Sequence, residues 1–120
     1  MQTQNIGKIG EDAACKCLKK NKYKILERNY RQKFGEIDII ATYGDTISFV
    51  EVKTRKNDSF GLPCEYVTYS KKKRIIKTAY EYILENSLDT NYSFDVIEVY
   101  HQDGKVTQIR HIKNAFEVEW

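Results

Sequence analysis

The stretch GEIDIIATYGDTISFVEVKTR, residues 35–55, decides how this chain folds. Two runs rich in Ile, Val and Phe lie on either side of Gly44-Asp45, a glycine-first pair suited to the two-residue type II′ turn of a β-hairpin. The pattern therefore predicts two antiparallel strands, over about 35–43 and 46–55.

Charged residues interrupt these apolar runs, where an ionised group is costly unless it is paired or bound to a metal. The hairpin register predicts that Asp38 lies opposite Glu51 and that Glu36 lies opposite Lys53. Two carboxylates directly across from one another repel. A cation between Asp38 and Glu51 would reverse that repulsion, and an oxygen-ligated ion such as Mg²⁺ suits such a pair.

The rest of the chain predicts one α/β domain over residues 1–120 with a mixed β-sheet flanked by helices, in the order α-β-β-β-α-β followed by a C-terminal hairpin. The expected elements are a helix over Ile6 to about Lys20, a strand over 23–30, a loop over 56–69, a helix from an N-cap at Ser70 to about Asn86, a strand over 92–100, a turn at 102–105 and a strand over 106–112.

Charge is unevenly distributed along the chain, which has a formal net charge of +3. Residues 1–77 hold 17 Lys and Arg against 9 Asp and Glu, whereas residues 78–120 hold 3 against 8. A basic half favours a polyanionic partner and nucleic acid in particular, although lysine-rich surfaces also arise from solubility alone.

The composition argues against a membrane protein and against a disulfide scaffold. No apolar run reaches the length of a membrane span, and the first five residues lack the pattern of a signal peptide, so a cytoplasmic location is expected. Cys15, Cys17 and Cys64 have neither a disulfide nor a zinc spacing and are expected to be reduced packing residues. A catalytic thiol at Cys64, beside Pro63, is the alternative.

Alternation along residues 49–55 places Glu51, Lys53 and Arg55 on one face of their strand, and the hairpin register adds Asp38. Two carboxylates can hold a divalent cation, while a lysine beside them can orient water or stabilise developing charge on a phosphate. The pattern indicates metal-dependent phosphodiester hydrolysis. The same charges also fit a cross-strand ion-pair lattice on a solvated face.

Four motifs follow one another along nearly the whole chain, and in combination they resemble the YraN family, a branch of the PD-(D/E)XK nuclease superfamily. The resemblance implies a restriction-endonuclease-like core and a relation to Holliday-junction resolvases and RecB-type nucleases. The motifs are GEDAA at 10–14, GEIDII at 35–40, FVEVKTR at 49–55 and FDVI at 94–97.

The resemblance also implies site residues. Asp38, Glu51 and Lys53 correspond to the catalytic Asp and Glu-x-Lys positions, and Asp38, Glu51 and the backbone carbonyl of Val52 would hold Mg²⁺ or Mn²⁺. Glu11 matches a supporting helix acid, for which the alternative is an interaction with the helix macrodipole.

One position departs from the family pattern. The family usually has Arg before Phe-Asp-Val, whereas this chain has Ser93, so a phosphate contact or an internal salt bridge is expected to be missing. Asp95 is therefore assigned a structural role as the partner of a nearby base.

Basic residues predict where a nucleic-acid backbone would bind. A cationic start of the second helix favours a bound phosphate, with Lys71 or Lys72 nearest the acids, although a solvated basic turn is the alternative. The nine tyrosines are dispersed and are expected in the core and not as a stacking platform. The expected nucleic-acid contacts are Arg55, Lys56, Lys71, Lys72, Lys73 and Arg74.

The leading function is a Mg²⁺- or Mn²⁺-dependent endonuclease that acts on DNA, without strong sequence preference but with selectivity for branched or single-stranded structure. The alternative is a catalytically inactive nucleic-acid-binding module with the same fold, and a third is an adaptor that binds a basic partner through acids such as Glu117 and Glu119. Resolvases often act as symmetric dimers, so a homodimer is an expected assembly.

Overall fold

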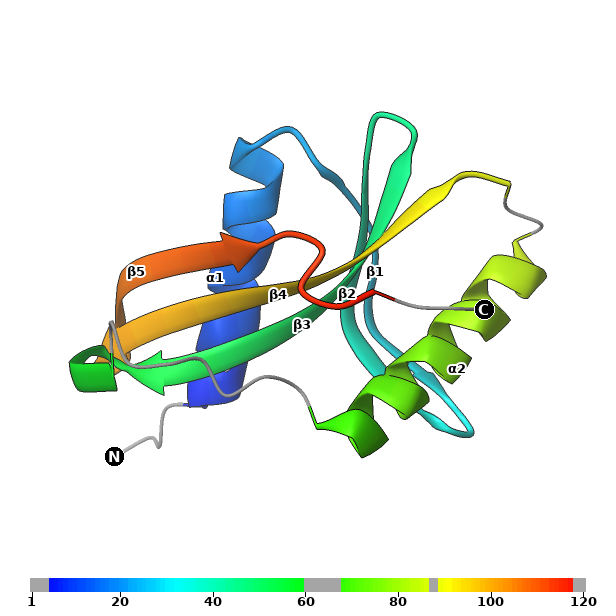
Figure 1. Cartoon of the computed structure of the whole chain (residues 1–120). Helices are drawn as coiled ribbons and strands as arrows, with labels where there is room; N and C mark the ends of the chain where they lie inside the picture. Colours follow the sequence, from blue (N-terminus) through cyan, green and yellow to red (C-terminus); the bar gives the residue numbers. More distant parts are fainter. Residues whose placement is uncertain (1–4, 60–67, 87–88, 118–120) are drawn as a thin grey trace.

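One five-stranded sheet organises the chain (Figure 1). The computed structural model describes residues 5–59, 68–86 and 89–117. The strands lie in the order β1-β2-β3-β4-β5, with β3 and β4 parallel and every other neighbouring pair antiparallel. The elements are α1 (Ile6–Lys20), β1 (Lys24–Gln32), β2 (Gly35–Tyr43), β3 (Thr46–Lys56), the 3₁₀ turn η1 (Asn57–Ser59), α2 (Tyr69–Glu85), β4 (Asn91–Gln102) and β5 (Lys105–Ile112).

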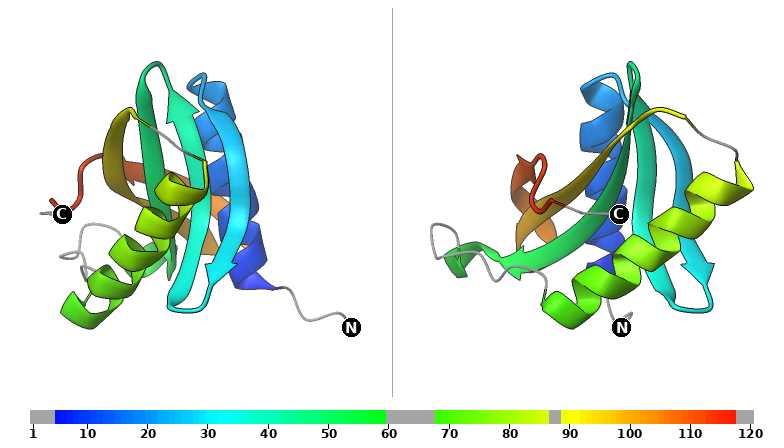
Figure 2. Two further views of the ribbon diagram at one scale, coloured as in Figure 1. Left: turned by 90° about the vertical axis from the view of Figure 1, so that its right-hand side faces the viewer. Right: turned by 45° about the vertical axis from the view of Figure 1, so that its right-hand side comes forward.

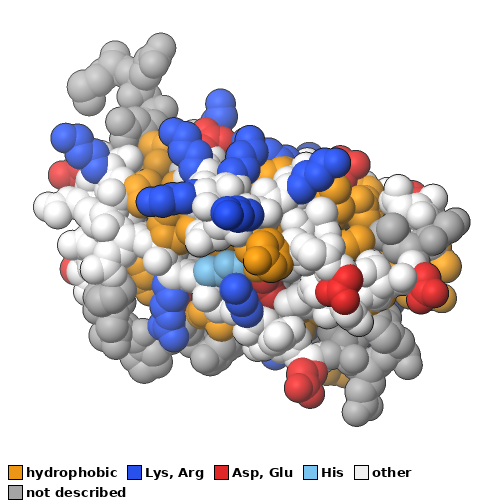
Figure 3. Space-filling view, turned by 90° about the horizontal axis from the view of Figure 1, so that it is seen from above, with side chains coloured by type: hydrophobic (Ala, Val, Ile, Leu, Met, Phe, Trp, Pro, Cys, Tyr) orange, Lys and Arg blue, Asp and Glu red, His pale blue; other side chains and the backbone are white. Residues whose placement is uncertain are grey.

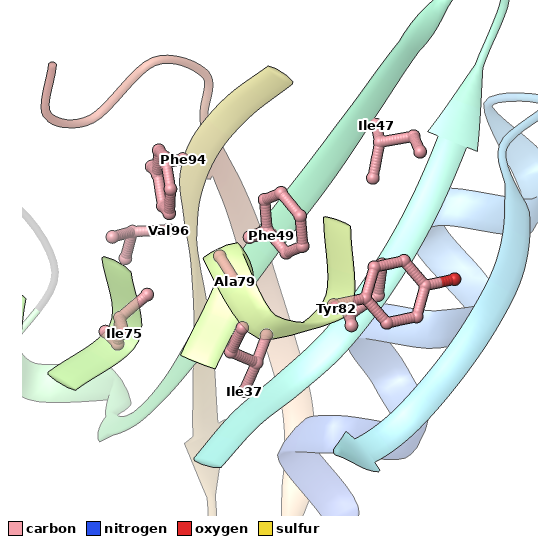
Figure 4. Close-up of a cluster of buried hydrophobic side chains, with 9 residues drawn as sticks. Ile37, Ile47, Phe49, Ile75, Ala79, Tyr82, Phe94 and Val96 are labelled. Atoms are coloured by element: carbon pink, nitrogen blue, oxygen red, sulfur yellow. The ribbon is translucent and has the colours of Figure 1, made fainter. Parts of the chain in front are cut away.

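The two helices cover opposite faces of this sheet (Figure 2). Residues under α2 form one core cluster, in which Phe49 packs with Phe94 and Tyr82 (Figure 4). Residues under α1 form a second cluster around Leu18, Ile39 and Ile97, all fully buried. The sheet therefore has an apolar layer on each side, which explains its near-continuous apolar strands.

The predicted fold class is confirmed, including the mixed sheet and the C-terminal hairpin. The predicted N-cap Ser70 is wrong: Thr68 caps the helix, because its extended backbone lets its hydroxyl oxygen accept from the Lys71 N–H at 3.2 Å.

The predicted loop over 56–69 lies largely outside the described residues, as do Pro63 and Cys64. None of the described helices is long and apolar enough to cross a membrane.

The predicted hairpin register is confirmed at the turn. Gly44 has a φ of +59°, as the first central residue of a type II′ turn requires, and the pairing runs from Tyr43–Thr46 to Ile39–Val50. Beyond Val50 the register pairs end, so the predicted pairings of Asp38 with Glu51 and of Glu36 with Lys53 are both wrong as register pairs. Asp38 accepts a hydrogen bond from the Val52 N–H, next to Glu51, and still feels the charge of Glu51. Glu36 is instead paired with Arg31 of β1, with Glu36 Oε2 3.3 Å from Arg31 Nε.

The alternation of side chains along β2 breaks at Asp38. Ile37 belongs to the cluster under α2, whereas Ile39 belongs to the cluster under α1, although regular alternation would place both on one face. Asn29, between the β1 residues that pair with Ile39 and Ile37, has a φ of +52°. A local irregularity across both strands therefore lies beside the acids.

The expectation that the tyrosines belong to the core holds for only some of them. Tyr82 and Tyr100 are buried, but Tyr69 and Tyr80 of α2 are 74% and 49% exposed. Helical periodicity separates the tyrosines of α2, because Tyr82 recurs with buried Ile75 and Ala79. Tyr69 and Tyr80 lie off that stripe.

We predict that Gly10→Ala destabilises the protein. Gly10 of α1 is buried against β3, and an added Cβ would stand 3.2 Å from Thr54 Cβ and closer still to Thr54 Oγ1. Overpacking of this kind costs ~1–3 kcal/mol, which exceeds the helix propensity gained from alanine. Urea denaturation measures the change in unfolding free energy.

Gly7→Ala is the matched control, because its added Cβ would meet Asn5 Oδ1 at an ordinary 3.4 Å. The double variant Gly10→Ala/Thr54→Ala should lose less stability than the two single losses added together, since it removes the clashing hydroxyl. Strict additivity would contradict a clash between these two residues.

Candidate acidic site under the start of α2

A pocket of about 450 Å³ lies between the beginning of β2, the middle of β3 and the first turns of α2. Acids come from the strands and cations from the helix. Its lining residues include Gly35, Glu36, Asp38, Glu51, Thr68, Ser70, Lys71, Arg74 and Ile75. The parallel β3–β4 pairing requires a crossover, and α2 is that crossover, so the chain topology delivers the basic helix start to the acids.

Asp38 is held by the backbone of the neighbouring strand. Its Oδ2 accepts a hydrogen bond from the Val52 N–H at 2.8 Å, just past the last β2–β3 register pair. Burial, and next the negative charge of Glu51, raise the pKa of Asp38 to about 7, although the Val52 N–H acts in the opposite direction. Asp38 therefore combines a fixed position with an unfavourable ionised state.

Glu51 is the second acid of the site and is only 7% exposed. The Lys71 ammonium forms an ion pair with Glu51 Oε1. Of the two lysines that the sequence left open, Lys71 thus lies at the acids, whereas the Lys72 ammonium lies 5.3 Å from the centre of the Phe116 ring. The cation of α2 balances part of the charge of the carboxylate pair.

Glu11 is linked to the site through Asn29. With its amide nitrogen turned toward the acids, Asn29 donates to Glu11 Oε1 at 2.8 Å and to Glu36 Oε1 at 3.0 Å. Burial raises the pKa of Glu11, against the lowering effect of the nearby Arg28 guanidinium. Glu11 also contributes to the raised pKa of Asp38, so its negative charge is felt at the centre of the site.

Sequence reasoning missed Asn29 as part of this site and did not place Glu36 there. Asparagine is among the few residues that tolerate a positive φ, and its occurrence inside a strand was the available signal. The hairpin register predicts Lys53 as the partner of Glu36. Because the β2–β3 pairing ends at Val50, Glu36 contacts Asn29 instead.

Lys53 follows Glu51 by two residues on β3 and is half-buried. It is not among the described residues that line the pocket. The Val52 N–H points to Asp38, which ties the Glu-x-Lys segment directly to the acid of β2.

The donor set is small. Within residues 5–59, 68–86 and 89–117, no group of three or more His, Cys, Asp or Glu side chains is arranged to hold a metal ion. Mg²⁺ is commonly held by one or two carboxylates, with waters and substrate phosphates completing its shell. Half-buried Asp38 and buried Glu51, two hard-oxygen ligands that repel each other, therefore fit such an ion.

The remaining predicted nucleic-acid contacts are spread over several surfaces. Arg74 lines the pocket. Arg55 forms an ion pair with buried Glu98 of β4, with Arg55 Nε 3.3 Å from Glu98 Oε2. Lys56 is exposed at the end of β3. Lys73 carries its ammonium 4.7 Å from the centre of the Tyr69 ring. Figure 3 shows that Lys and Arg side chains also gather on the face seen from above.

Asp95 has the structural role predicted for it. It is 1% exposed and contacts His111 Nε2 at 2.7 Å, while the Asn114 N–H at 3.1 Å and the Ser93 hydroxyl donate to its Oδ1. Although burial acts to raise it, these partners hold the pKa of Asp95 below its ordinary value. The base is His111 of β5, so the expectation that Asp95 partners a base is confirmed.

The fold and the site define an α/β protein in which a five-stranded mixed sheet carries a pair of neighbouring carboxylates beneath a basic helix start. The chain belongs to the uncharacterised protein family UPF0102, whose family model matches residues 10–99 and so spans all four motifs. This finding confirms the resemblance to the YraN family.

The relatives of this chain match nearly its whole length. A UPF0102 protein of Clostridioides difficile (strain 630) is 50% identical over 117 residues, which cover 97% of this chain and 100% of that protein. A UPF0102 protein of Clostridium acetobutylicum is 50% identical over 115 residues, or 93% of each chain. Another, of Caldanaerobacter subterraneus, is 46% identical over 116 residues, covering 94% and 95%.

The raised pKa of Asp38 predicts a pH dependence of stability. Because the folded-state pKa of about 7 lies above the ordinary 3.8, the folded state retains a proton that the unfolded state releases. The stabilising contribution is fully present below about pH 4 and is lost as the pH rises to about 7, at about 1.4 kcal/mol for each unit of pKa difference.

Urea denaturation from pH 4 to 7 measures the free energy of unfolding. Asp38→Asn should remove the decline in this free energy with rising pH. Asp12→Asn is the matched control, because the Arg28 hydrogen bond lowers the pKa of this exposed acid and its own effect has the opposite sign. It should keep the decline between pH 4 and 7. Parallel profiles for the wild type and Asp38→Asn would contradict the assignment.

Proposed function

We propose that this protein is a metal-dependent nuclease that hydrolyses phosphodiester bonds in DNA, with Asp38 and Glu51 at its centre. The observation that carries the proposal is the closeness of half-buried Asp38 to the buried carboxylate of Glu51, whose negative charge adds to the effect of burial in raising the pKa of Asp38. Cations of α2 border the pair, as binding of a phosphate backbone requires.

Asp38, Glu51 and the backbone carbonyl of Val52 would hold Mg²⁺ or Mn²⁺. When bound, such an ion supplies Lewis-acid stabilisation of the charge that develops on phosphoryl oxygens. Removal of the repulsion between the two acids would accompany binding, since both carboxylates would then be ionised beside a positive charge.

The chain's own groups would do the remaining work. The Lys53 ammonium would donate a hydrogen bond that orients the attacking water. Lys71 and Arg74 would attract the phosphate backbone at the pocket wall. Glu11, positioned by Asn29, would add negative charge that favours binding of a cation.

We further propose that the protein acts in the cytoplasm and, like resolvases, as a homodimer.

A nucleic-acid-binding module without turnover is the second candidate. The ion pair between Lys71 and Glu51 favours it, because that ammonium already balances the charge of one acid without a metal. Such a module would retain salt-dependent binding through its basic residues and would show no cleavage with any divalent cation.

We predict that Mg²⁺ or Mn²⁺ binds to the purified protein and that Asp38→Asn abolishes binding, as measured by calorimetric titration. Lys71→Gln should raise the affinity for the metal ion, because it removes a cation that competes for Glu51. Asp89→Asn, which removes an exposed acid before β4, is the control and should bind like the wild type. Equal binding by the wild type and Asp38→Asn would exclude this metal site.

We also predict Mn²⁺-dependent cleavage when branched, single-stranded and duplex DNA are offered. Asp38→Ala and Lys53→Ala should each lower the cleavage rate by at least about 100-fold, because general acid–base and electrostatic groups contribute about that much or more. Gel electrophoresis of end-labelled DNA measures the rate, with Asp89→Asn as the matched control. Cleavage that survives unchanged in both active-site variants would rule out the proposed residues.

A further inference from the structure

Two exposed aromatic residues are chain neighbours of residues that line the acidic pocket. Phe34, in the β1–β2 turn, directly precedes Gly35 of the pocket lining and is 46% exposed. Tyr69 lies between the lining residues Thr68 and Ser70 and is 74% exposed. Rings this open to water bury little area and add little to the stability of the fold, and they remain accessible to a ligand.

Each of these rings carries a lysine. The Lys77 and Lys33 ammoniums lie 5.1 and 5.8 Å from the centre of the Phe34 ring, and the Lys73 ammonium lies 4.7 Å from that of Tyr69. None of the ion pairs among the described residues involves these three lysines. Their charges remain available to an anionic ligand.

The outer face of α2 continues the same chemistry. Positions 69, 73, 77 and 80 recur at helical spacing on the side opposite the buried residues Ile75 and Tyr82. The right-hand view of Figure 2 shows α2 packed across one face of the sheet. All four of these positions are exposed. Two aromatic rings and two lysines therefore share one exposed face of the helix.

We propose that these ring–lysine pairs bind unpaired nucleotides, so that the substrate has a single-stranded segment at the pocket. The flat face of a base can stack on an exposed ring while a neighbouring phosphate contacts the lysine beside it. Bases in a duplex are already stacked on one another and cannot reach the rings without being unpaired. The inference deepens the proposed function and rests on the pocket being the nucleic-acid site.

A protein partner or a second copy of the chain fits this surface less well. Protein interfaces are depleted in lysine at their centres, and burying an uncompensated ammonium is costly. Here three lysines surround the two rings, so a dry interface would have to bury or displace them. A polyanion pairs with those charges instead.

The test is fluorescence anisotropy in EDTA with a labelled short oligothymidylate and a blunt duplex of the same length. Phe34→Ala and Tyr69→Ala should each weaken single-strand binding about ten-fold, because one lost base–ring stack has about that effect. Duplex binding should change less than about two-fold, since it relies on phosphate contacts. Phe34→Tyr and Tyr69→Phe should restore single-strand binding, because they keep the ring.

Tyr43→Ala is the matched control, because this ring is similarly exposed but lies at the tip of the β2–β3 hairpin. It should leave both affinities unchanged. Equal losses on both forms of DNA, no loss on either, or no binding by the wild type would overturn the inference. So would sedimentation showing a dimer that Phe34→Ala dissociates, because the ring would then belong to a subunit interface.

The measurement separates this inference from the nuclease proposal. Without divalent cations no metal-dependent cleavage takes place, so ring-dependent binding of single strands supports the inference even if the protein never cuts DNA. Conversely, Mn²⁺-dependent cleavage of blunt duplex that is unaffected by Phe34→Ala and Tyr69→Ala would support the nuclease and overturn the inference.

Discussion

The hydrogen bond from the Val52 N–H to the Asp38 carboxylate is the contact on which the rest of this site depends. It joins β2 to β3 where their register pairs end and fixes an acid inside the protein. Because Asp38 is thus held beside Glu51, its ionised form is disfavoured by burial and by charge repulsion. The strand alternation breaks at the same residue, and Glu36 turns to Asn29 and Arg31 of β1.

The topology of the sheet supplies the balancing charge. Parallel β3 and β4 need a crossover, and α2 begins over the acids with Lys71 on Glu51. The same helix presents Tyr69 and Lys73 outward, so one element contributes both to the acidic pocket and to the surface beside it. The strands contribute the negative charges of the pocket, and the start of α2 contributes the positive charges. A divalent cation would be attracted to the first and a phosphodiester to the second.

Much of the fold could be predicted from sequence because its signals are local. The helical periodicity over Ile6–Lys20 predicted α1 with the observed bounds, and Gly44-Asp45 predicted the hairpin register near the turn. The register failed further along, where the Asp38 side chain occupies the Val52 N–H and the β2–β3 pairing ends. The N-cap was misplaced by two residues, because Thr68 and Ser70 have equivalent capping chemistry and only the backbone conformation distinguishes them.

Local sequence patterns are enough to identify which groups in this protein are chemically unusual. The acids within apolar strands, the Glu-x-Lys triplet and the basic run of the second helix were visible because each is a local pattern. Which of them meet follows from the folded chain: Lys71 and not Lys72 contacts Glu51, Asn29 lies between Glu11 and Glu36, and Lys77 lies over Phe34. The reason is physical, because strand pairing and helix packing bring together residues far apart in the chain, and their geometry is set by the whole sheet.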